Sequence, residues 1–254
     1  MEHLELVTTL LLLAASFSAG FIDSISGGGG LLLMPALLVA GLPPQMTLGT
    51  NKFASFFGTG IAFANFIYNK KVVWSIAAVG LPFSLLGTYL GAKSILLFSN
   101  DTIGKIIVFL LPLAMVVTLL PRQNQVLTPN RRSLFLKTPL VCLLLGFYDG
   151  FFGPGTGSFL ILALYSLLGI GLVEASATAK AFNLASNLGA LLVFFLDGKV
   201  LVLLGLPLAA ANIAGNYFGS RLVLSGGVNV VKRCLLVSFT LLIISLFMKY
   251  FIFQ

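Results

Sequence analysis

Long apolar segments recur along this chain, and they constrain its fold more than any other feature. Mainly apolar blocks occupy residues 106–120 and 235–247, and with their flanks they reach the roughly 20 residues that a helix needs to cross a bilayer. Only 9% of the 254 residues are charged, whereas a soluble domain carries about 25% to cover itself with a wet surface. The sequence therefore predicts an integral membrane protein.

The fold class we expect is an all-α polytopic membrane protein. The apolar segments that we predict lie near residues 4–22, 30–42, 46–67, 72–97, 103–121, 134–152, 157–172, 178–196, 200–224 and 230–253. The most polar stretch is RQNQVLTPNRRS at residues 122–133. We expect it to be a basic linker between a first membrane repeat, residues 1–121, and a second one, residues 134–254.

The two halves share sequence motifs at a nearly constant spacing. GFIDSISGGGG begins at Gly20 and GFYDGFFGPGTG at Gly146, an offset of 126 residues. Later pairs of identical residues are offset by 128, among them Thr50 and Thr178, Lys52 and Lys180, and Gly87 and Gly215. Such self-similarity indicates an internal duplication of four to five hydrophobic segments.

Basic residues test how the halves are oriented. If all ten segments cross, the halves are inverted and nine Lys and Arg lie on the linker side against four opposite. If the short segments are re-entrant, the halves are parallel and the count is eight against five. Because basic residues collect on the cytoplasmic side, the count favours inverted halves with a cytoplasmic linker.

The second segment of each half is short and follows a glycine-rich run. Residues 30–42 span roughly 20 Å as a helix, less than the hydrocarbon core of about 30 Å. Paired short, Gly/Pro-interrupted segments are typical of the binding sites of repeat-built transporters, and helix starts suit anions. The alternative is close helix packing through small residues. The binding candidates of these runs are Gly27, Gly28, Gly29, Gly30, Gly153, Gly155, Thr156 and Gly157.

Lys52 and Lys180 lie about one turn inside apolar segments at matched positions. A charged side chain inside a membrane costs about 2.5–3.5 kcal/mol on insertion scales, so it faces a cavity or a partner unless it snorkels to the interface. We expect these lysines to bind an anion. Polar neighbours that could assist are Thr50, Asn51, Asn183 and Asn187, although hydrogen bonds between helices explain them equally well.

Asp23 and Asp149 each precede a glycine run by a few residues. A capping role is favoured, in which the carboxylate accepts N–H bonds from the broken helix. Proton coupling, or pairing with Lys52 or Lys180, is the other interpretation.

Several other functions lack the residues they need. The net charge of +8 fits basic residues near lipid headgroups rather than a nucleic-acid partner. His3 is the single histidine, and the two cysteines form no CxxC motif, so we expect no metal and no cofactor. With no P-loop and no Ser-His-Asp triad possible, we expect no enzyme.

The paired motifs resemble the sulfite exporter TauE/SafE family over essentially the whole chain. The first half carries GFIDSISGGGGLLLMPALLVAGLPPQMTLGTNKFASFFGTG, and the second carries GFYDGFFGPGTGSFLI and then ATAKAFNLASNLGAL. The resemblance implies a multi-pass permease of the bacterial inner membrane that moves sulfite, sulfonates or related sulfur oxyanions. Pro154 and Thr156 replace glycines of the first-half run, which puts exact symmetry of the site in doubt.

We therefore expect alternating access around a central anion site, most plausibly for export. An anion channel is one alternative, and a non-transporting membrane protein, such as a membrane enzyme or an assembly factor, is another. The partners are a small inorganic or organosulfur anion and the lipid bilayer. The sequence leaves the anion, its coupling ion and the oligomeric state open.

Overall fold

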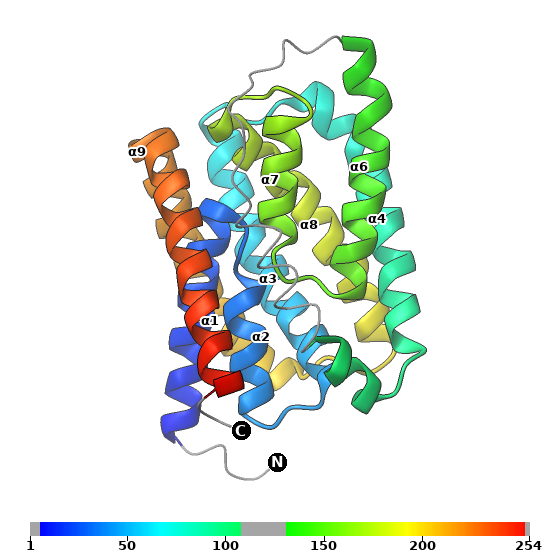
Figure 1. Ribbon diagram of the computed structural model, residues 1–254, viewed down its shortest axis with the longest axis vertical. Coiled ribbons are helices and arrows are strands. Elements are labelled where there is room, and N and C mark those ends of the chain that lie inside the picture. The colour runs from blue at the N-terminus through cyan, green and yellow to red at the C-terminus, as the bar shows by residue number, and fades with distance from the viewer. Residues whose placement is uncertain (1–5, 108–130, 252–254) are drawn as a thin grey trace.

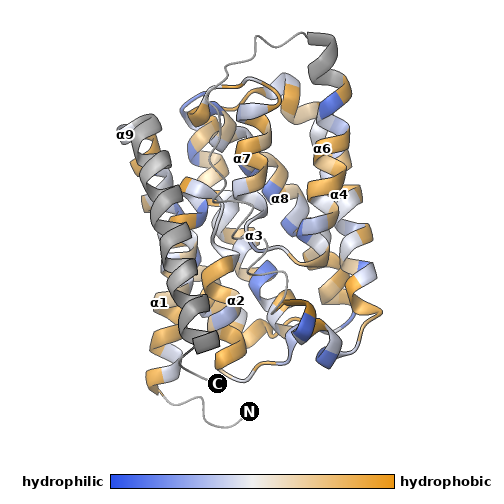
Figure 2. Ribbon diagram, viewed as in Figure 1, coloured by the Kyte–Doolittle hydropathy of each residue, from blue (hydrophilic) through white to orange (hydrophobic). Residues whose placement is uncertain are grey.

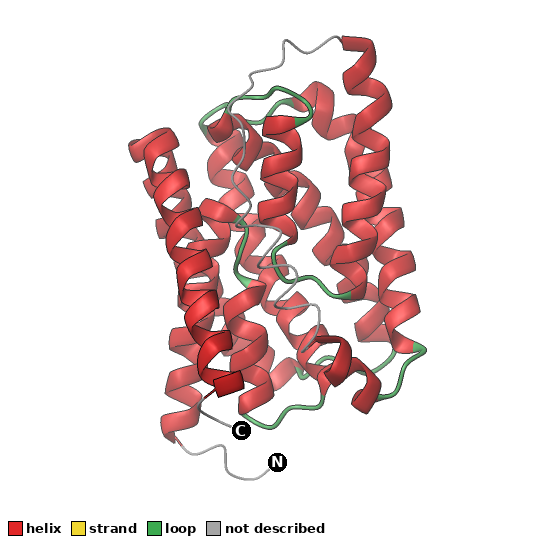
Figure 3. Ribbon diagram, viewed as in Figure 1, coloured by secondary structure: helices red, strands yellow, loops and turns green. Residues whose placement is uncertain are grey.

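The computed structural model describes the backbone of residues 6–107 and 131–251 and the side chains of residues 6–107 and 136–226. Within these ranges every regular element is a helix, joined by short loops (Figure 3). The predicted all-α fold is therefore confirmed for the described residues. The linker expected at residues 122–133 lies outside them, except that its last residues already belong to the helix that begins at Arg131.

The helices fall into two similar series. The first series is α1 (Leu6–Ser26), α2 (Gly30–Val39), α3 (Pro44–Tyr68) and α4 (Trp74–Leu96). The second is α6 (Arg131–Phe151), α7 (Thr156–Ser166), α8 (Leu172–Leu196) and α9 (Val202–Phe251). Residues 100–107 are also helical.

Four described helices are long and apolar enough to cross a membrane: α1, α4, α8 and residues 202–226 of α9. The predicted short segments are confirmed as the helices α2 and α7, of 10 and 11 residues. The last two expected segments, 200–224 and 230–253, both fall largely within the helical residues labelled α9, of which Val202–Gly226 is long and apolar enough to cross a membrane.

Two helix pairs flank a central group. α1 packs along α9, and α4 packs along α6, while α3 and α8 contact each other and the flanking pairs. Figure 1 shows α1 and α9 on the left, α4 and α6 on the right, and the short helices between them, α2 in the lower half and α7 in the upper half. Figure 2 shows hydrophobic residues along most of the helices in this view, as expected of a chain surrounded by lipid.

Threonines buried in the central helices hold the starts of the outer ones. The backbone N–H of Leu201 donates to Thr50 Oγ1 at 3.1 Å, and the N–H of Val73 donates to Thr178 Oγ1 at 3.0 Å. The two N–H groups lie just before α9 and α4, where a helix has no internal acceptor for its first N–H groups. Each central helix is therefore tied to an outer helix of the other series.

Candidate functional site

A buried polar cavity of about 30 Å³ lies where the central helices meet the two short ones. Its lining comes from both series of helices and consists of Asp23, Gly27, Gly30, Asn51, Lys52, Ser55, Asp149, Gly153, Gly157, Asn183 and Asn187. The volume has room for about one or two water molecules. The lining is polar although apolar clusters surround it, which indicates a site for a polar or charged ligand.

The short helices begin beside this cavity, and their starting loops touch. Gly27 has φ +77, and a Cβ atom there would collide with the backbone of Gly157. A Cβ atom at Gly157 would in turn collide with the backbone of Gly27. The hydroxyl of Ser158 donates to the carbonyl of Ser26 across the same junction, at 2.6 Å. Only residues without a side chain allow so close an approach, and it brings the starts of α2 and α7 together at the cavity.

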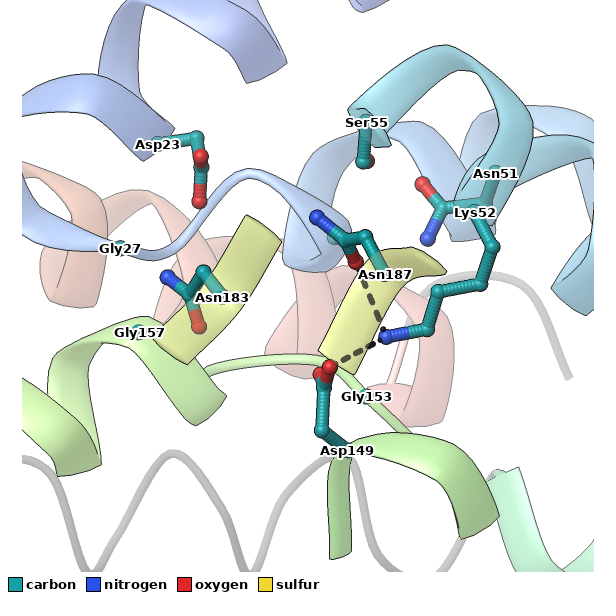
Figure 4. Close-up of a pocket in the computed structure, with 11 residues that line it drawn as sticks. Asp23, Gly27, Asn51, Lys52, Ser55, Asp149, Gly153, Gly157, Asn183 and Asn187 are labelled. Carbon is teal, nitrogen blue, oxygen red and sulfur yellow. Dashed lines mark hydrogen bonds and ion pairs between the residues drawn. The ribbon is translucent and has the colours of Figure 1, made fainter. Parts of the chain in front are cut away.

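Lys52 enters the cavity from α3 and is neutralised by the other half of the chain. Its Nζ lies 2.7 Å from Asp149 Oδ2 and donates to Asn187 Oδ1 at 3.2 Å, as Figure 4 shows. Only 4% of the lysine side chain and 6% of the aspartate side chain are exposed. The contact with Asp149 is an ion pair without hydrogen-bond geometry, and Oδ2 accepts no hydrogen bond from any described residue.

Lys180 enters from α8 and is enclosed at the end of α1. Its Nζ donates to Asp23 Oδ2 at 2.9 Å and also to the backbone carbonyl of Asp23. Its side chain is 0% exposed. A cation is favourable at a helix C-terminus, where carbonyl groups lack partners within the helix. Lys180 therefore fixes the end of α1 rather than facing the cavity.

A chain of hydrogen bonds joins the two ion pairs. Asn187 accepts from Lys52 and donates through Nδ2 to Thr59 Oγ1 at 3.3 Å. The Thr59 hydroxyl in turn donates to Asp23 Oδ2 at 3.4 Å. The two ion pairs, Asn187 and Thr59 therefore form one connected network, here called the polar centre. A change at one ion pair alters the interactions of the other.

One amide at the cavity has an atom without a partner. Asn51 is buried, and its Oδ1 has no hydrogen-bond partner among the described residues. Its Nδ2 lies near Gly30, at the start of α2. Asn183 is also buried and lies beside Gly157 at the start of α7. An unpaired buried polar group costs about 1–3 kcal/mol, so the Asn51 oxygen indicates a hydrogen-bond donor, such as a water or a protonated ligand, in the cavity.

The structure gathers most of the predicted site residues. Those that line the cavity are Asp23, Gly27, Gly30, Asn51, Lys52, Asp149, Gly153, Gly157, Asn183 and Asn187. Those outside its lining are Gly28, Gly29, Thr50, Gly155, Thr156 and Lys180. Thr50 instead accepts the N–H of Leu201, and the Thr156 hydroxyl donates to the carbonyl of Gly153 at 2.8 Å.

The structure pairs the two aspartates with lysines, which was the other interpretation of these residues. Neither α2 nor α7 has a side-chain hydrogen bond at its N-cap, which is Gly29 in one and Gly155 in the other. Asp23 and Asp149 lie instead in the last turns of α1 and α6, and both face lysines. Pairing with an ammonium group compensates a buried carboxylate more fully than neutral N–H donors do.

Ser55 and Thr59 were missed by the sequence interpretation, yet a signal for both exists. Adding the repeat offset of 128 to 55 gives 183, and adding it to 59 gives 187. Ser55 therefore corresponds to Asn183, and both line the cavity. Thr59 corresponds to Asn187, and these two are hydrogen-bonded to each other.

Among the described side chains, no group of three or more His, Cys, Asp or Glu could hold a metal ion. The groups that line the cavity are one ammonium group, two carboxylates, amides, a hydroxyl and the glycines of both loops. Of these, the ammonium group, the amide N–H groups and the hydroxyl can donate hydrogen bonds to an anion.

Comparisons with known proteins place the chain in a family. The profile of the sulfite exporter TauE/SafE family matches residues 12–246. The chain is 38% identical to the Sinorhizobium protein named "Probable membrane transporter protein ORF9", over 93% of this chain and 91% of that protein. It is 37% identical to the Escherichia coli K12 "Probable membrane transporter protein YfcA", over 93% and 89%.

A plant relative matches a smaller part. The Arabidopsis thaliana "Sulfite exporter TauE/SafE family protein 5" is 33% identical over 40% of this chain and 24% of its own length. No solved structure matches the chain. Since the family profile covers most of the sequence and the bacterial relatives align along nearly their whole length, the chain belongs to the sulfite exporter TauE/SafE family of multi-pass membrane transporters.

Proposed function

We propose that this protein is a permease that carries a small anion, sulfite or a related sulfur oxyanion or organosulfonate, across the bacterial inner membrane by alternating access. Export is the direction that we propose. The observation that carries the proposal is the buried cavity, in which Lys52, the amides of Asn51 and Asn183 and the starts of both short helices converge. The lysine supplies charge, and the helix starts supply N–H donors, in a place of low dielectric.

The size of the cavity favours a carrier over a channel. A sulfur oxyanion has at least four heavy atoms, whereas the cavity of about 30 Å³ accommodates one or two waters. The lining must therefore move apart to admit the anion, and a closed centre of this kind is expected of a carrier that occludes its substrate between two open states.

We further propose that residues 1–121 and 134–254 are inverted copies of one unit, joined by residues 122–133. Positive φ angles support this, because they occur at matched positions: Gly27 and Gly153, Gly41 and Gly169, Lys70 and Gly198. The offsets are 126, 128 and 128 residues, the same as those of the sequence motifs. The helix contacts are also reciprocal, since α1 packs on α9 and α6 packs on α4.

Flux measurements in proteoliposomes test the function. Purified protein would be reconstituted and loaded with sulfite, thiosulfate, sulfate, sulfoacetate or taurine, with protein-free vesicles as the control. We expect saturable flux of at least one of these anions and exchange between anions that share the site. Flux that does not saturate would favour an anion channel, and no flux above the protein-free control for any of them would contradict the proposed substrate class.

A further inference from the structure

The charges of the polar centre are balanced before any anion binds. The charged side chains of its hydrogen-bonded network come from four helices, Lys52 on α3, Lys180 on α8, Asp23 on α1 and Asp149 on α6. Tyr148, beside Asp149, donates its hydroxyl to the carbonyl of Pro154 at 2.8 Å and so adds no charge. Two ammonium groups and two carboxylates sum to zero, so an added anion would leave one uncompensated negative charge. A buried, uncompensated charge is strongly disfavoured, and such groups change protonation instead.

The two carboxylates differ in how firmly they are held. Asp23 Oδ2 accepts from Lys180 and from Thr59, and Lys180 also holds the carbonyl of the same residue. Asp149 has Lys52 as its one charged partner among the described side chains, and its Oδ2 accepts no hydrogen bond there. An anion that takes Lys52 therefore removes the partner of Asp149 but leaves Asp23 paired.

Resting on the proposed function, we infer that Asp149 is a proton-binding site that is filled when the anion binds. The anion replaces the carboxylate at Lys52 Nζ, and Asp149 takes a proton from water on the side to which the site is open. For a singly charged anion, the ammonium keeps its three protons, the carboxylate becomes a carboxylic acid, and the net charge of the site stays zero. Anion and proton then cross together, and release of the anion returns Lys52 to Asp149 and the proton to water.

The pH dependence of binding tests this inference. The probe is methanesulfonate, which has one charge and does not titrate between mildly acidic and neutral pH. If binding takes up one proton, its affinity for the purified protein should weaken by up to about tenfold for each unit by which the pH rises, because linked equilibria are reciprocal. In Asp149→Asn the affinity should no longer depend on pH.

Two further variants serve as comparisons. Asp197→Asn changes a half-exposed carboxylate outside the cavity and should leave the pH dependence unchanged. Asp23→Asn removes the other carboxylate of the network and should retain the pH dependence, whatever its effect on stability. Asp149→Asn that keeps the wild-type pH dependence, or wild-type protein whose affinity does not change with pH, would overturn the inference.

Methanesulfonate flux in proteoliposomes gives a second measurement that needs no variant. Joint movement of one negative charge and one proton is electrically neutral, so an imposed pH gradient should drive the flux and a potassium diffusion potential should not. Saturable flux that follows the potential and ignores the pH gradient would overturn proton binding while leaving the proposed anion transport intact. Absence of both methanesulfonate binding and sulfite flux would instead overturn the proposed function.

Discussion

The two ion pairs at the centre of the molecule have the same composition but different surroundings. Lys180 is fully enclosed and holds both the carboxylate and the carbonyl of Asp23 at the end of α1. Lys52 lines the cavity and shares its ammonium group between Asp149 and the amide of Asn187. Identical residues at matched positions therefore serve one structural contact and one contact that a ligand can replace.

The difference follows from the loops that come after α1 and α6. After α1, the N–H of Gly27 continues the helical pattern by donating to the carbonyl of Asp23 at 2.8 Å. After α6, the N–H of Gly153 donates to the backbone carbonyl of Tyr148, five residues earlier, at 3.1 Å. The hydroxyl of Tyr148 donates to the carbonyl of Pro154, a residue that replaces a glycine of the first loop. The second loop therefore differs from the first in its backbone path beside the cavity.

The largest effect should come from Lys180→Met, which removes the enclosed ammonium group. It leaves Asp23 as a carboxylate without its charged partner. Removing one partner of a buried ion pair costs about 3–5 kcal/mol of folding stability. We expect a marked fall in melting temperature and in the yield of monodisperse protein in detergent. Lys180→Met combined with Asp23→Asn should recover part of the loss, because no charge is then left unpaired. A single variant as stable as the wild type would remove the distinction between the pairs.

Gly27→Ala should have the next largest effect, because it acts on the junction of the two loops. The positive φ and the collision with Gly157 each add strain, together about 2–5 kcal/mol. The matched control is Gly41→Ala, where φ is +85 but no atom lies within 4 Å of the added Cβ. Thermal unfolding of the two variants should therefore separate collision from backbone strain. Equal losses in both would mean that the close contact of the loops contributes nothing.

Lys52→Met should weaken anion binding, and because it leaves the buried Asp149 without its charged partner it should also lower stability. Loss of a charge-assisted hydrogen bond contributes about 1.5–3 kcal/mol, or roughly a 10- to 150-fold weaker affinity. Lys93→Met is the control, because Lys93 lies over the ring of Tyr89, outside the cavity. Binding of the best anion from the flux screen would be measured for both variants. Well-folded Lys52→Met protein that binds the anion normally would contradict the role given to this lysine.

The smallest effect concerns the turns after α3 and α8. Lys70 has φ 55, a left-handed conformation that disfavours side chains, whereas the matched position in the second half is Gly198. Lys70→Gly should therefore raise the free energy of unfolding, by about 1 kcal/mol at most. Gly198→Ala should lower it by a similar amount. Thermal unfolding of both variants in the same detergent is the measurement, and a destabilised Lys70→Gly variant would contradict the correspondence of the two turns.

Much of this architecture could be predicted from residue patterns. The apolar segments predicted the helices, and the glycine runs predicted the short helices α2 and α7. Lys52, Asn183 and Asn187 were predicted at a common site because polar side chains inside a membrane need partners or ligands. These are local signals, and in the structure the three residues line the same cavity.

The partners of these residues could not be predicted in the same way. Whether Lys52 meets Asp23 or Asp149 depends on how α3 lies against α6 and α1, which no local pattern records. The role of Thr50 depends likewise on the start of α9, 151 residues away.

The packing of α1 against α9 has a consequence for how the chain is made. The hydroxyl of Ser16 donates to the carbonyl of Leu208, and Asn212 donates to the carbonyl of Ser16, across 192 and 196 residues of sequence. At a synthesis rate of about 5–20 residues per second, roughly 10–40 s separate the emergence of the two partners from the ribosome. During that interval α1 has neither acceptor nor donor for these polar groups from its later neighbour. α1 must therefore wait in the membrane, or be held by an insertion factor, until α9 arrives.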